Sequence, residues 1–307
     1  MNDATLLGVD AGGSRTSAVV ASADGRALAR AEEGPGKIIP GAEEAAAAAI
    51  ARACRDALQR ARRPAPVVAL VAGVSGAGRV DSRDALESAL RAAGLAERVA
   101  VVTDADVALE AAFGSGPGIV LIAGTGSIAW ARLPDGSLAR VGGLGSFVGD
   151  QGSAYDLGRR ALRAAALALE GLGPASLLAG RIEAVTGAGV EALGRWAAGA
   201  SVADVAALAP LVLDVARERD PVSRRLVREA VSALAEHVRL LAARFPQGSQ
   251  VPVAYGGGLL AKHRDYRAKL TTRLRRLVPA ASVQRGPVDG AMGAVRLAMK
   301  TGSGVGG

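Results

Sequence analysis

The sequence of 307 residues contains very little cysteine, histidine or aromatic residue. It has one cysteine, Cys54, and two histidines, His237 and His263, which lie far apart along the chain. One cysteine excludes a disulfide or a cysteine cluster within the subunit, and two distant histidines leave little material for a transition-metal site. Any metal is therefore expected to be a cation held by carboxylates and phosphates, such as Mg²⁺.

Long apolar runs are also missing. No stretch approaches the ~20 consecutive apolar residues of a membrane span, and the sequence enters a predicted strand at once, without a basic and apolar leader. We therefore expect a cytoplasmic protein with no membrane partner.

Lysine is scarce too, although the net charge is +8. The basic residues are nearly all arginines, scattered through Ala-rich helical stretches beside Glu and Asp. The densest basic run, residues 264–276, contains one aromatic side chain, Tyr266. This pattern is typical of a solvated helix face, so we expect no nucleic-acid partner.

Glycine is abundant, and two glycine-rich turns are the most informative motifs. Residues 10–16 and 123–127 each follow an apolar β-run and precede another, so both predict a strand, a tight turn and a returning strand. Glycines let the backbone turn with positive φ and approach a ligand closely, and nearby hydroxyls offer further donors. Two such turns could close on one phosphate chain.

The setting of these turns excludes two common nucleotide folds. A dinucleotide fold needs a helix directly after its glycines, whereas a β-branched strand follows here. The P-loop requires a lysine and then Ser or Thr at the end of the glycine run, but all four lysines lie outside the glycine turns.

The order of elements predicts an internal duplication. With Gly13 laid on Gly124, an offset of 111 also aligns Thr16 with Ser127, Asp24 with Asp135 and Gly25 with Gly136. Each half begins with a three-stranded meander, and later helices are predicted at 43–62, 82–93, 105–113, 153–170, 175–185, 190–197, 209–219, 222–244, 260–277 and 289–299. We predict domains at residues 1–115 and 116–307, with a last helix at 289–300 that could pack back on the first domain, and a disordered tail at 302–307.

A pair of duplicated units, each opening with a phosphate-binding hairpin, resembles the superfamily of sugar kinases, heat-shock ATPases and actin. Ser75-Gly76, Thr103-Asp104 and residues 142–155 are similar to the N-acetylglucosamine kinase branch, grouped with the BadF/BadG/BcrA/BcrD-type ATPases. The segment 149–153 is the most specific part. The resemblance implies an α/β fold of two duplicated ribonuclease H-like (actin-like ATPase) domains, with mixed five-stranded sheets, helices on both faces and an interdomain cleft.

The same resemblance assigns roles to residues of the turns and strand ends. It implies that ATP is held by three loops, formed by Gly12, Gly13, Ser14, Arg15 and Thr16, by Gly124, Thr125, Gly126 and Ser127, and by Gly256, Gly257, Gly258 and Leu259. Asp10 would bind Mg²⁺, directly or through water. The residues that would contact the sugar are Gly36, Lys37, Ser75, Gly76, Asp104, Gly143, Leu144, Gly145 and Asp150.

Two of the aspartates have simpler explanations. Asp104 lies where a strand gives way to a helix and could be only the helix N-cap. Ligands gather at the carboxyl ends of strands, however, and sugar phosphorylation needs a carboxylate beside the attacking hydroxyl, so we predict Asp104 as the catalytic base, with Asp106 as its competitor. Asp150 could likewise cap a helix, with Ser153 an equal candidate.

The predicted function is an ATP-dependent kinase that phosphorylates a primary hydroxyl of an amino sugar, N-acetylglucosamine or glucosamine. Leu144 and Gly36 stand where animal relatives carry tryptophan and asparagine, so the sugar itself is not fixed. The alternatives are an ATPase that activates a 2-hydroxyacyl-CoA dehydratase or benzoyl-CoA reductase-type partner, and a sugar sensor without catalysis. A homodimer is compatible with the sequence, which does not fix the oligomeric state.

Overall fold

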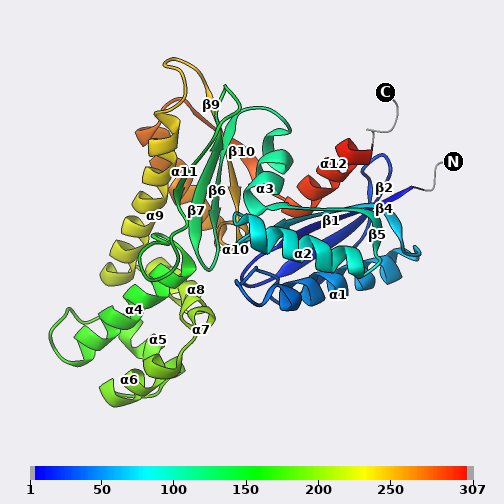
Figure 1. The fold of residues 1–307 in the computed structure, drawn as a ribbon. Helices are drawn as coiled ribbons and strands as arrows, with labels where there is room; N and C mark the ends of the chain where they lie inside the picture. The colour runs from blue at the N-terminus through cyan, green and yellow to red at the C-terminus, as the bar shows by residue number, and fades with distance from the viewer. Residues whose placement is uncertain (1–3, 303–307) are drawn as a thin grey trace. The chain divides into compact units, whose positions relative to one another are not determined.

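A computed structural model of the protein describes residues 4–302, with side chains to residue 300 (Figure 1). The chain divides into two compact units, one formed by Met1–Gly116 with Val288–Gly307 and the other by Pro117–Pro287. Of the tail predicted to be disordered, only residue 302 is described, and it ends a helix. Within residues 4–302, no helix has the length and apolar character needed to cross a membrane.

Unit 1 is built on a five-stranded mixed sheet in the order β3-β2-β1-β4-β5. Its strands are β1 (Thr5–Ala11), β2 (Thr16–Ser22), β3 (Ala27–Glu33), β4 (Val67–Val74) and β5 (Ala96–Thr103). The first three strands form an antiparallel meander, and β4 and β5 add parallel strands beside β1. Its helices are α1 (Glu43–Ala61), α2 (Val80–Ala92), α3 (Asp104–Phe113) and α12 (Gly290–Gly302).

Helices cover both faces of this sheet. Because alternate residues of β1 point to opposite faces, this strand contributes side chains to two separate cores. Leu7 and Val9 belong to a core shared with α1 and α2, whereas Leu6 packs in a second core with α3 and α12. Gly8 allows the close approach of α12, since a Cβ there would lie 2.4 Å from the carbonyl oxygen of Ala291. These contacts bring the end of β1 and the start of α12 together.

Unit 2 repeats the same strand order, β10-β9-β6-β7-β8. Its strands are β6 (Gly118–Ala123), β7 (Ser127–Arg132), β8 (Leu138–Gly142), β9 (Val251–Gly256) and β10 (Ala281–Pro287). Its helices are α4 (Ala154–Leu169), α5 (Leu177–Thr186), α6 (Val190–Gly199), α7 (Val202–Ala206), α8 (Ala209–Arg217), α9 (Pro221–Ala242), α10 (Gly258–Lys262) and α11 (Arg264–Leu277). The predicted fold class is confirmed, with two duplicated mixed five-stranded sheets.

The strand register corrects one detail of the predicted duplication. Ala11 pairs with Thr16 and Ala123 pairs with Ser127, so four residues form the first turn and three form the second. The offset is therefore 112 for the first strands (123 − 11) and 111 only from the second strands onward (127 − 16). Gly12, not Gly13, is the structural counterpart of Gly124.

The helical segments differ from the predictions at two places. The helix expected at 260–277 is broken at His263, whose φ of −109° and ψ of 86° are not helical. Arg267 stabilises the break, because its guanidinium donates to the carbonyl oxygens of Leu260 at 2.6 Å and Ala261 at 3.2 Å. The short helix α7 was not predicted, although Ser201 and Asp204 form a capping box at its start.

Candidate functional site

The first glycine turn joins β1 to β2 and lies at the carboxyl end of β1. The Gly12 N–H donates to the carbonyl oxygen of Arg15 at 2.9 Å, which closes the turn. Gly13 and Ser14 are exposed at its tip. Arg15 is also exposed and forms an ion pair with Glu32 at 2.9 Å.

A second loop, residues 34–38, lies directly against this turn. The N–H groups of Gly36 and Lys37 both donate to the carbonyl oxygen of Gly12 at 3.1 Å. The hydroxyl of Thr16, which is fully buried, donates to the carbonyl oxygen of Gly34 at 2.9 Å. Gly36 has no room for a side chain, since a Cβ would lie 2.3 Å from the Thr16 hydroxyl oxygen. The structure thus places Gly36 and exposed Lys37 beside the predicted phosphate turn.

Ser75 and Gly76 join the same group at the end of β4. The Ser75 N–H donates to the carbonyl oxygen of Ala11, and the Ile38 N–H donates to that of Ser75, both at 2.9 Å. Gly76 has a φ of +94° and lies against the backbone of Ile38. A Cβ at Gly76 would be 2.8 Å from the carbonyl oxygen of Ile38. Three segments distant in sequence therefore meet at one edge of the sheet.

The structure separates the roles of Asp104 and Asp106. Thr103 is the N-cap of α3, and it forms a capping box with Asp106, whose carboxylate accepts the Thr103 N–H at 3.0 Å. Asp104 takes no part in this cap. Its carboxylate accepts the adjacent Ala105 N–H at 3.0 Å and the hydroxyl of Ser75. Burial raises the pKa of Asp104, and these hydrogen bonds partly offset the rise.

Asp10, near the end of β1, lies close to Asp104. Burial, and then the charge of Asp104, raise the pKa of Asp10 to about 6. Asp289 adds to the rise, although its carboxylate pairs with Arg30. Gly290, the first residue of α12, lies against Asp10, since a Cβ there would be 2.5 Å from Oδ2. The start of α12 therefore belongs to this group, and sequence analysis missed it.

These residues fit a magnesium ion better than a metal bound by protein alone. Within residues 4–302, no group of three or more His, Cys, Asp or Glu side chains is arranged to hold a metal. Magnesium is usually bound by one or two carboxylates together with substrate phosphates and waters. Two neighbouring carboxylates that repel each other, Asp10 and Asp104, are compatible with a cation of that kind.

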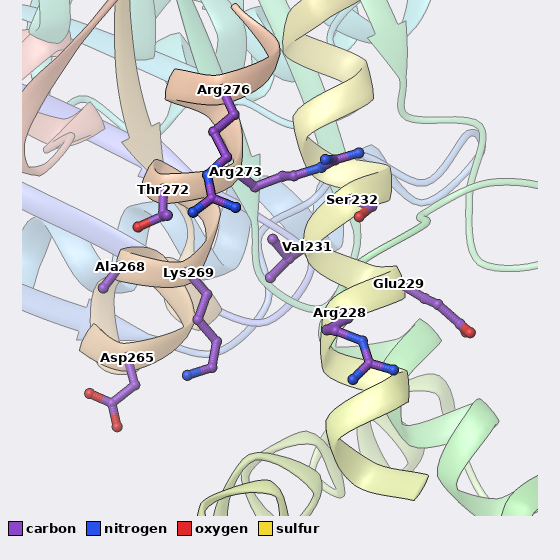
Figure 2. Close-up of a pocket in the computed structure, with 10 residues that line it drawn as sticks. All are labelled: Arg228, Glu229, Val231, Ser232, Asp265, Ala268, Lys269, Thr272, Arg273 and Arg276. Atoms are coloured by element: carbon purple, nitrogen blue, oxygen red, sulfur yellow. The ribbon is translucent and has the colours of Figure 1, made fainter. Parts of the chain in front are cut away.

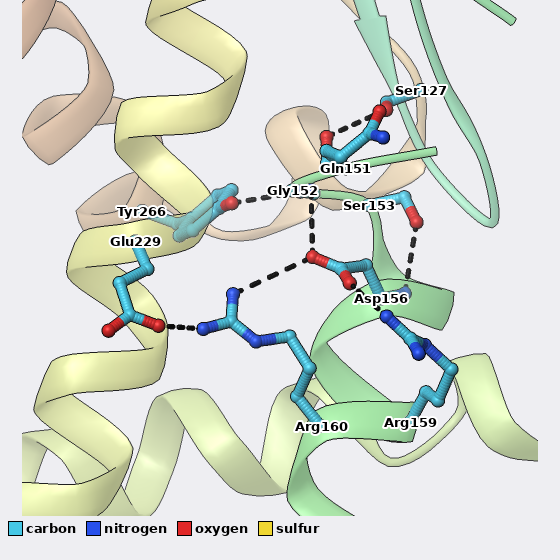
Figure 3. Close-up of polar contacts among 9 residues, drawn as sticks. All are labelled: Ser127, Gln151, Gly152, Ser153, Asp156, Arg159, Arg160, Glu229 and Tyr266. Atoms are coloured by element: carbon cyan, nitrogen blue, oxygen red, sulfur yellow. Dashed lines mark hydrogen bonds and ion pairs between the residues drawn. The ribbon is translucent and has the colours of Figure 1, made fainter. Parts of the chain in front are cut away.

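The second glycine turn in unit 2 has a similar construction. The Gly124 N–H closes the turn on the carbonyl oxygen of Gly126 at 2.9 Å. Ser127 is buried, and its hydroxyl donates to the carbonyl oxygen of Gln151 at 2.8 Å, as Figure 3 shows. The N–H of Tyr155 donates to the carbonyl oxygen of Thr125 at 3.2 Å. The hydroxyls of Thr16 and Ser127, expected as extra donors to a phosphate, thus donate within their own units.

The carboxylate of Asp150 packs against the second glycine turn and forms a hydrogen bond with it. The residue is buried and has a φ of +61°, which is unusual for an aspartate. Its Oδ1 accepts the Ser127 N–H at 3.0 Å, and both carboxylate oxygens lie 2.8 Å from where a Cβ of Gly126 would be. Ser153, and not Asp150, is the N-cap of α4, because its hydroxyl accepts the Asp156 N–H at 3.1 Å (Figure 3).

His237 of α9 lies near Asp150 and was not identified from the sequence. It is buried, and its Nδ1 has no hydrogen-bond partner among the described residues. Burial lowers the pKa of His237, and the charge of Asp150 opposes this effect. Its Nε2 faces Gly142, being 3.1 Å from where a Cβ would lie. A lone histidine in a long helix carries no signal that could have revealed this position.

The predicted sugar-contacting loop follows β8. Gly143 has a φ of +71° and lies against Ile128, whereas a Cβ on Gly145 would meet open space. Leu144 is 62% exposed, and Phe147 is almost wholly exposed at 98%. This loop therefore presents apolar side chains to solvent close to the second glycine turn.

The third predicted ATP loop packs on the second turn. Gly257 has a φ of +85°, and a Cβ there would lie 2.5 Å from the carbonyl oxygen of Ala123. Similarly, a Cβ at Gly124 would lie 3.3 Å from the backbone nitrogen of Gly258. Gly256 pairs with Ile122 in the sheet, and Leu259 is buried. The structure thus brings these glycines together within unit 2.

Each unit opens with a glycine turn and follows the order β-β-β-α-β-α-β, with several helices between the third and fourth strands of unit 2. This duplication defines a ribonuclease H-like fold of the actin-like ATPase class. The chain belongs to the BadF/BadG/BcrA/BcrD ATPase family, whose family model matches residues 7–298. This confirms the resemblance inferred from the motifs.

Named relatives cover most of the chain. An N-acetylmuramic acid/N-acetylglucosamine kinase of Clostridium acetobutylicum is 28% identical over 260 residues, which are 83% of this chain and 85% of the relative. An N-acetyl-D-glucosamine kinase of Dictyostelium discoideum is 26% identical over 317 residues, covering 98% and 99%. The crystal structure of a candidate N-acetylglucosamine kinase from Chromobacterium violaceum is 32% identical, with a TM-score of 0.80 over 97% of this chain and 99% of that one.

Proposed function

We propose that the protein is an ATP-dependent kinase that transfers the γ-phosphoryl group to the primary hydroxyl of an amino sugar, N-acetylglucosamine or glucosamine, to give the 6-phosphate. One observation carries the proposal: Asp104 stands at the carboxyl end of β5 and is not consumed by the helix cap, which Thr103 and Asp106 form. The names of the relatives support an amino sugar as acceptor.

Asp104 acts in this proposal as the general base. Its carboxylate would accept the proton of the sugar hydroxyl as that oxygen attacks the γ-phosphorus, while the bond from phosphorus to the leaving oxygen of ADP breaks. The hydrogen bonds from the Ala105 N–H and the Ser75 hydroxyl fix its orientation. A raised pKa brings the carboxylate closer to the operating pH, which favours proton acceptance.

The glycine turns are proposed to bind the phosphates mainly through backbone N–H groups. Each turn contains two glycines, and Gly13 and Ser14 are exposed at the tip of the first turn. Because the hydroxyls of Thr16 and Ser127 donate within their units, we expect these two residues to shape the turns rather than to supply side-chain donors. The adenosine is assigned to residues 256–259.

Magnesium completes the proposal. Asp10 would hold it, directly or through water, and a bound Mg²⁺ would neutralise negative charge on the transferring phosphates. We also propose a cytoplasmic location, where ATP is available. A homodimer remains compatible with this function.

We propose that residues of unit 2 also contact the sugar. Asp150 keeps one oxygen on the Ser127 N–H, so it would offer its other oxygen to a sugar hydroxyl. Exposed Leu144 would contribute an apolar surface beside Gly143 and Gly145. This arrangement accounts for sugar binding without naming the sugar.

A matched pair of variants tests the base. Asp104→Asn should retain ATP binding and lose turnover by roughly 10²–10⁴-fold, the usual contribution of a general base. Asp106→Asn should weaken the α3 cap by about 1 kcal/mol and leave turnover within a few-fold of normal. If Asp106→Asn were the inactive variant, Asp104 would lose the role of base.

The acceptor is tested by coupled release of ADP. The sugars to compare are N-acetylglucosamine, glucosamine, N-acetylmuramic acid, N-acetylmannosamine and glucose. We expect an N-acetylated amino sugar or glucosamine to raise the rate well above basal hydrolysis. Equal rates with and without every sugar would exclude the kinase and favour an ATPase.

The structure offers little for the ATPase activator proposed as an alternative. Relatives of that kind bridge an iron–sulfur cluster between subunits with cysteines, which must be accessible. Cys54 is fully buried in α1, and burial raises the pKa of its thiol to about 12. This thiol is therefore poorly placed to ligate a shared cluster.

A further inference from the structure

Helices α9 and α11 of unit 2 enclose an open groove of about 920 Å³ that no step of the proposed reaction uses (Figure 2). Four basic side chains line it from both walls. Arg228 comes from α9, and Lys269, Arg273 and Arg276 come from α11. All four are exposed, and Figure 2 shows Arg273 extended from α11 toward α9.

The acidic residues of the groove do not neutralise these charges. Glu229 forms an ion pair with Arg160 of α4, and Figure 2 shows it turned away from α11. Asp265 forms an ion pair with Arg217 of α8 at 2.8 Å. Within the described part of the chain, none of the four basic residues that line the groove forms an ion pair. The groove therefore gathers positive charge that the acidic side chains beside it do not neutralise.

The spacing of the charges indicates the form of that ligand. Lys269, Arg273 and Arg276 follow one another by four and three residues and share one face of α11. At a rise of about 1.5 Å per residue the row is about 10 Å long. Like charges so arranged repel one another, which is unfavourable without a bound anion. An anion with several charges in line would meet the whole row at once.

The donor types favour phosphate over carboxylate. Three of the four cations are arginines, whose guanidinium groups match phosphate oxygens in pairs. Ser232 and Thr272 add a hydroxyl from each wall. These groups together can donate to successive phosphates of a chain.

The apolar lining argues against two macromolecular ligands. Among the lining residues only Val231 and Ala268 have apolar side chains, so an amphipathic helix would find no aromatic, leucine or methionine side chain to pack its anchors against. No aromatic side chain lines the groove, so single-stranded nucleic acid would find no stacking platform. We propose that this groove binds a linear chain of phosphate groups, supplied either by a nucleoside triphosphate or by inorganic polyphosphate.

Calorimetry tests the groove with the full-length protein. One equivalent of a non-hydrolysable ATP analogue is added first, so that the tighter phosphate site elsewhere is filled, and the protein is then titrated with tripolyphosphate. Arg273→Glu combined with Arg276→Glu should weaken this binding by about 30-fold or more, because two charge-assisted contacts are replaced by repulsion. Arg224→Glu combined with Arg225→Glu makes the same change in charge on exposed residues of α9 outside the groove, and should weaken it by less than about 3-fold.

The same titration distinguishes the sources. If a second equivalent of ATP binds more tightly than tripolyphosphate, and this binding is lost in the Arg273→Glu, Arg276→Glu variant, the ligand is a nucleotide. If tripolyphosphate binds more tightly than the second equivalent of ATP, the ligand is inorganic polyphosphate. Equal losses in the two double variants, or no binding by the parent protein, would overturn the proposal. Tighter binding of an acidic peptide than of either phosphate chain would also overturn it. If the reversed charges prevent folding, Arg273→Gln with Arg276→Gln replaces them under the same criteria.

Discussion

A methyl group added to Gly126 should test how the second glycine turn is held. The Cβ of Gly126→Ala would lie 2.8 Å from both carboxylate oxygens of Asp150. Such a contact is shorter than two atoms of this kind tolerate, so either Asp150 or the turn must move. Asp150 cannot move freely, because it is buried and its Oδ1 accepts the Ser127 N–H at 3.0 Å.

The expected cost follows from that hydrogen bond. Displacing the carboxylate sacrifices a hydrogen bond to a charged group, which is worth about 1.5–3 kcal/mol. Gly126→Ala should therefore reduce the free energy of unfolding of unit 2 by about 1.5–3 kcal/mol. In an Asp150→Ala background the clash no longer exists, and the same substitution should cost less than about 0.5 kcal/mol.

The assay can report on unit 2 alone. The two tryptophans of the chain, Trp130 in β7 and Trp196 in α6, both lie in unit 2, so urea unfolding followed by tryptophan fluorescence monitors this unit. Gly180→Ala is the control, because a Cβ at this exposed position of α5 meets nothing within 4 Å. It should stabilise the protein by about 0.5–1 kcal/mol, as expected for Gly to Ala within a helix.

One result would refute this reasoning. If Gly126→Ala cost the same in the parent and in the Asp150→Ala background, the strain would not arise from the carboxylate. The turn would then be held by contacts other than the one with Asp150, and the cycle would assign no coupling to the pair.

Three further predictions concern buried polar groups and close contacts. Because the pKa of Asp10 is raised to about 6, ionising this carboxyl group lowers the stability of the protein as pH rises from about 4 to 6. Thermal unfolding measured at each pH should show that Asp10→Asn stabilises the protein by up to about 3 kcal/mol above pH 6 and by little below pH 4. A gain in stability that did not vary with pH would contradict this prediction. The Cβ of Gly290→Ala would lie 2.5 Å from the Asp10 carboxylate, so this variant should displace the carboxylate and raise the magnesium concentration needed for half-maximal turnover. Gly194→Ala should leave that concentration unchanged, because a Cβ at residue 194 meets open space. Tyr266→Phe should lower the stability of unit 2 by about 1–3 kcal/mol, because the Tyr266 hydroxyl donates to the buried carbonyl oxygen of Gly152 at 2.9 Å (Figure 3). A loss below about 0.5 kcal/mol would show that this carbonyl finds another donor.

The parts of the fold predicted correctly were those encoded locally. The alternating apolar strands, the two hairpins and the long helices α1 and α9 follow from periodicity and turn residues, and their bounds agree within a few residues. The break at His263 was not predictable in this way, since it depends on Arg267 satisfying the carbonyls of Leu260 and Ala261. The one-residue difference between the glycine turns was also invisible, because only the strand register reveals it.

The site shows a similar division. Sequence reasoning selected Asp104 over Asp106 but could not see that Thr103 and Asp106 pair in a capping box, which leaves Asp104 outside the cap. It recognised the hydroxyls near the glycines but not their direction, which is set by carbonyls of residues far along the chain. Gly290 was not identified as part of the site, because its contact with Asp10 bridges 280 positions of sequence (290 − 10).

The position of α12 has a consequence for how the protein is made. This helix follows unit 2 in the sequence but packs on β1 and β4 of unit 1, where Gly8 faces Ala291 and Gly293 faces the carbonyl oxygen of Val107. During synthesis, β1 therefore emerges from the ribosome long before the helix that covers it, while the strands and helices of unit 2 emerge in one continuous stretch. The first unit to begin translation should thus be the last to complete its core, and the apolar face of β1 and β4 must be kept from aggregation until α12 has been translated.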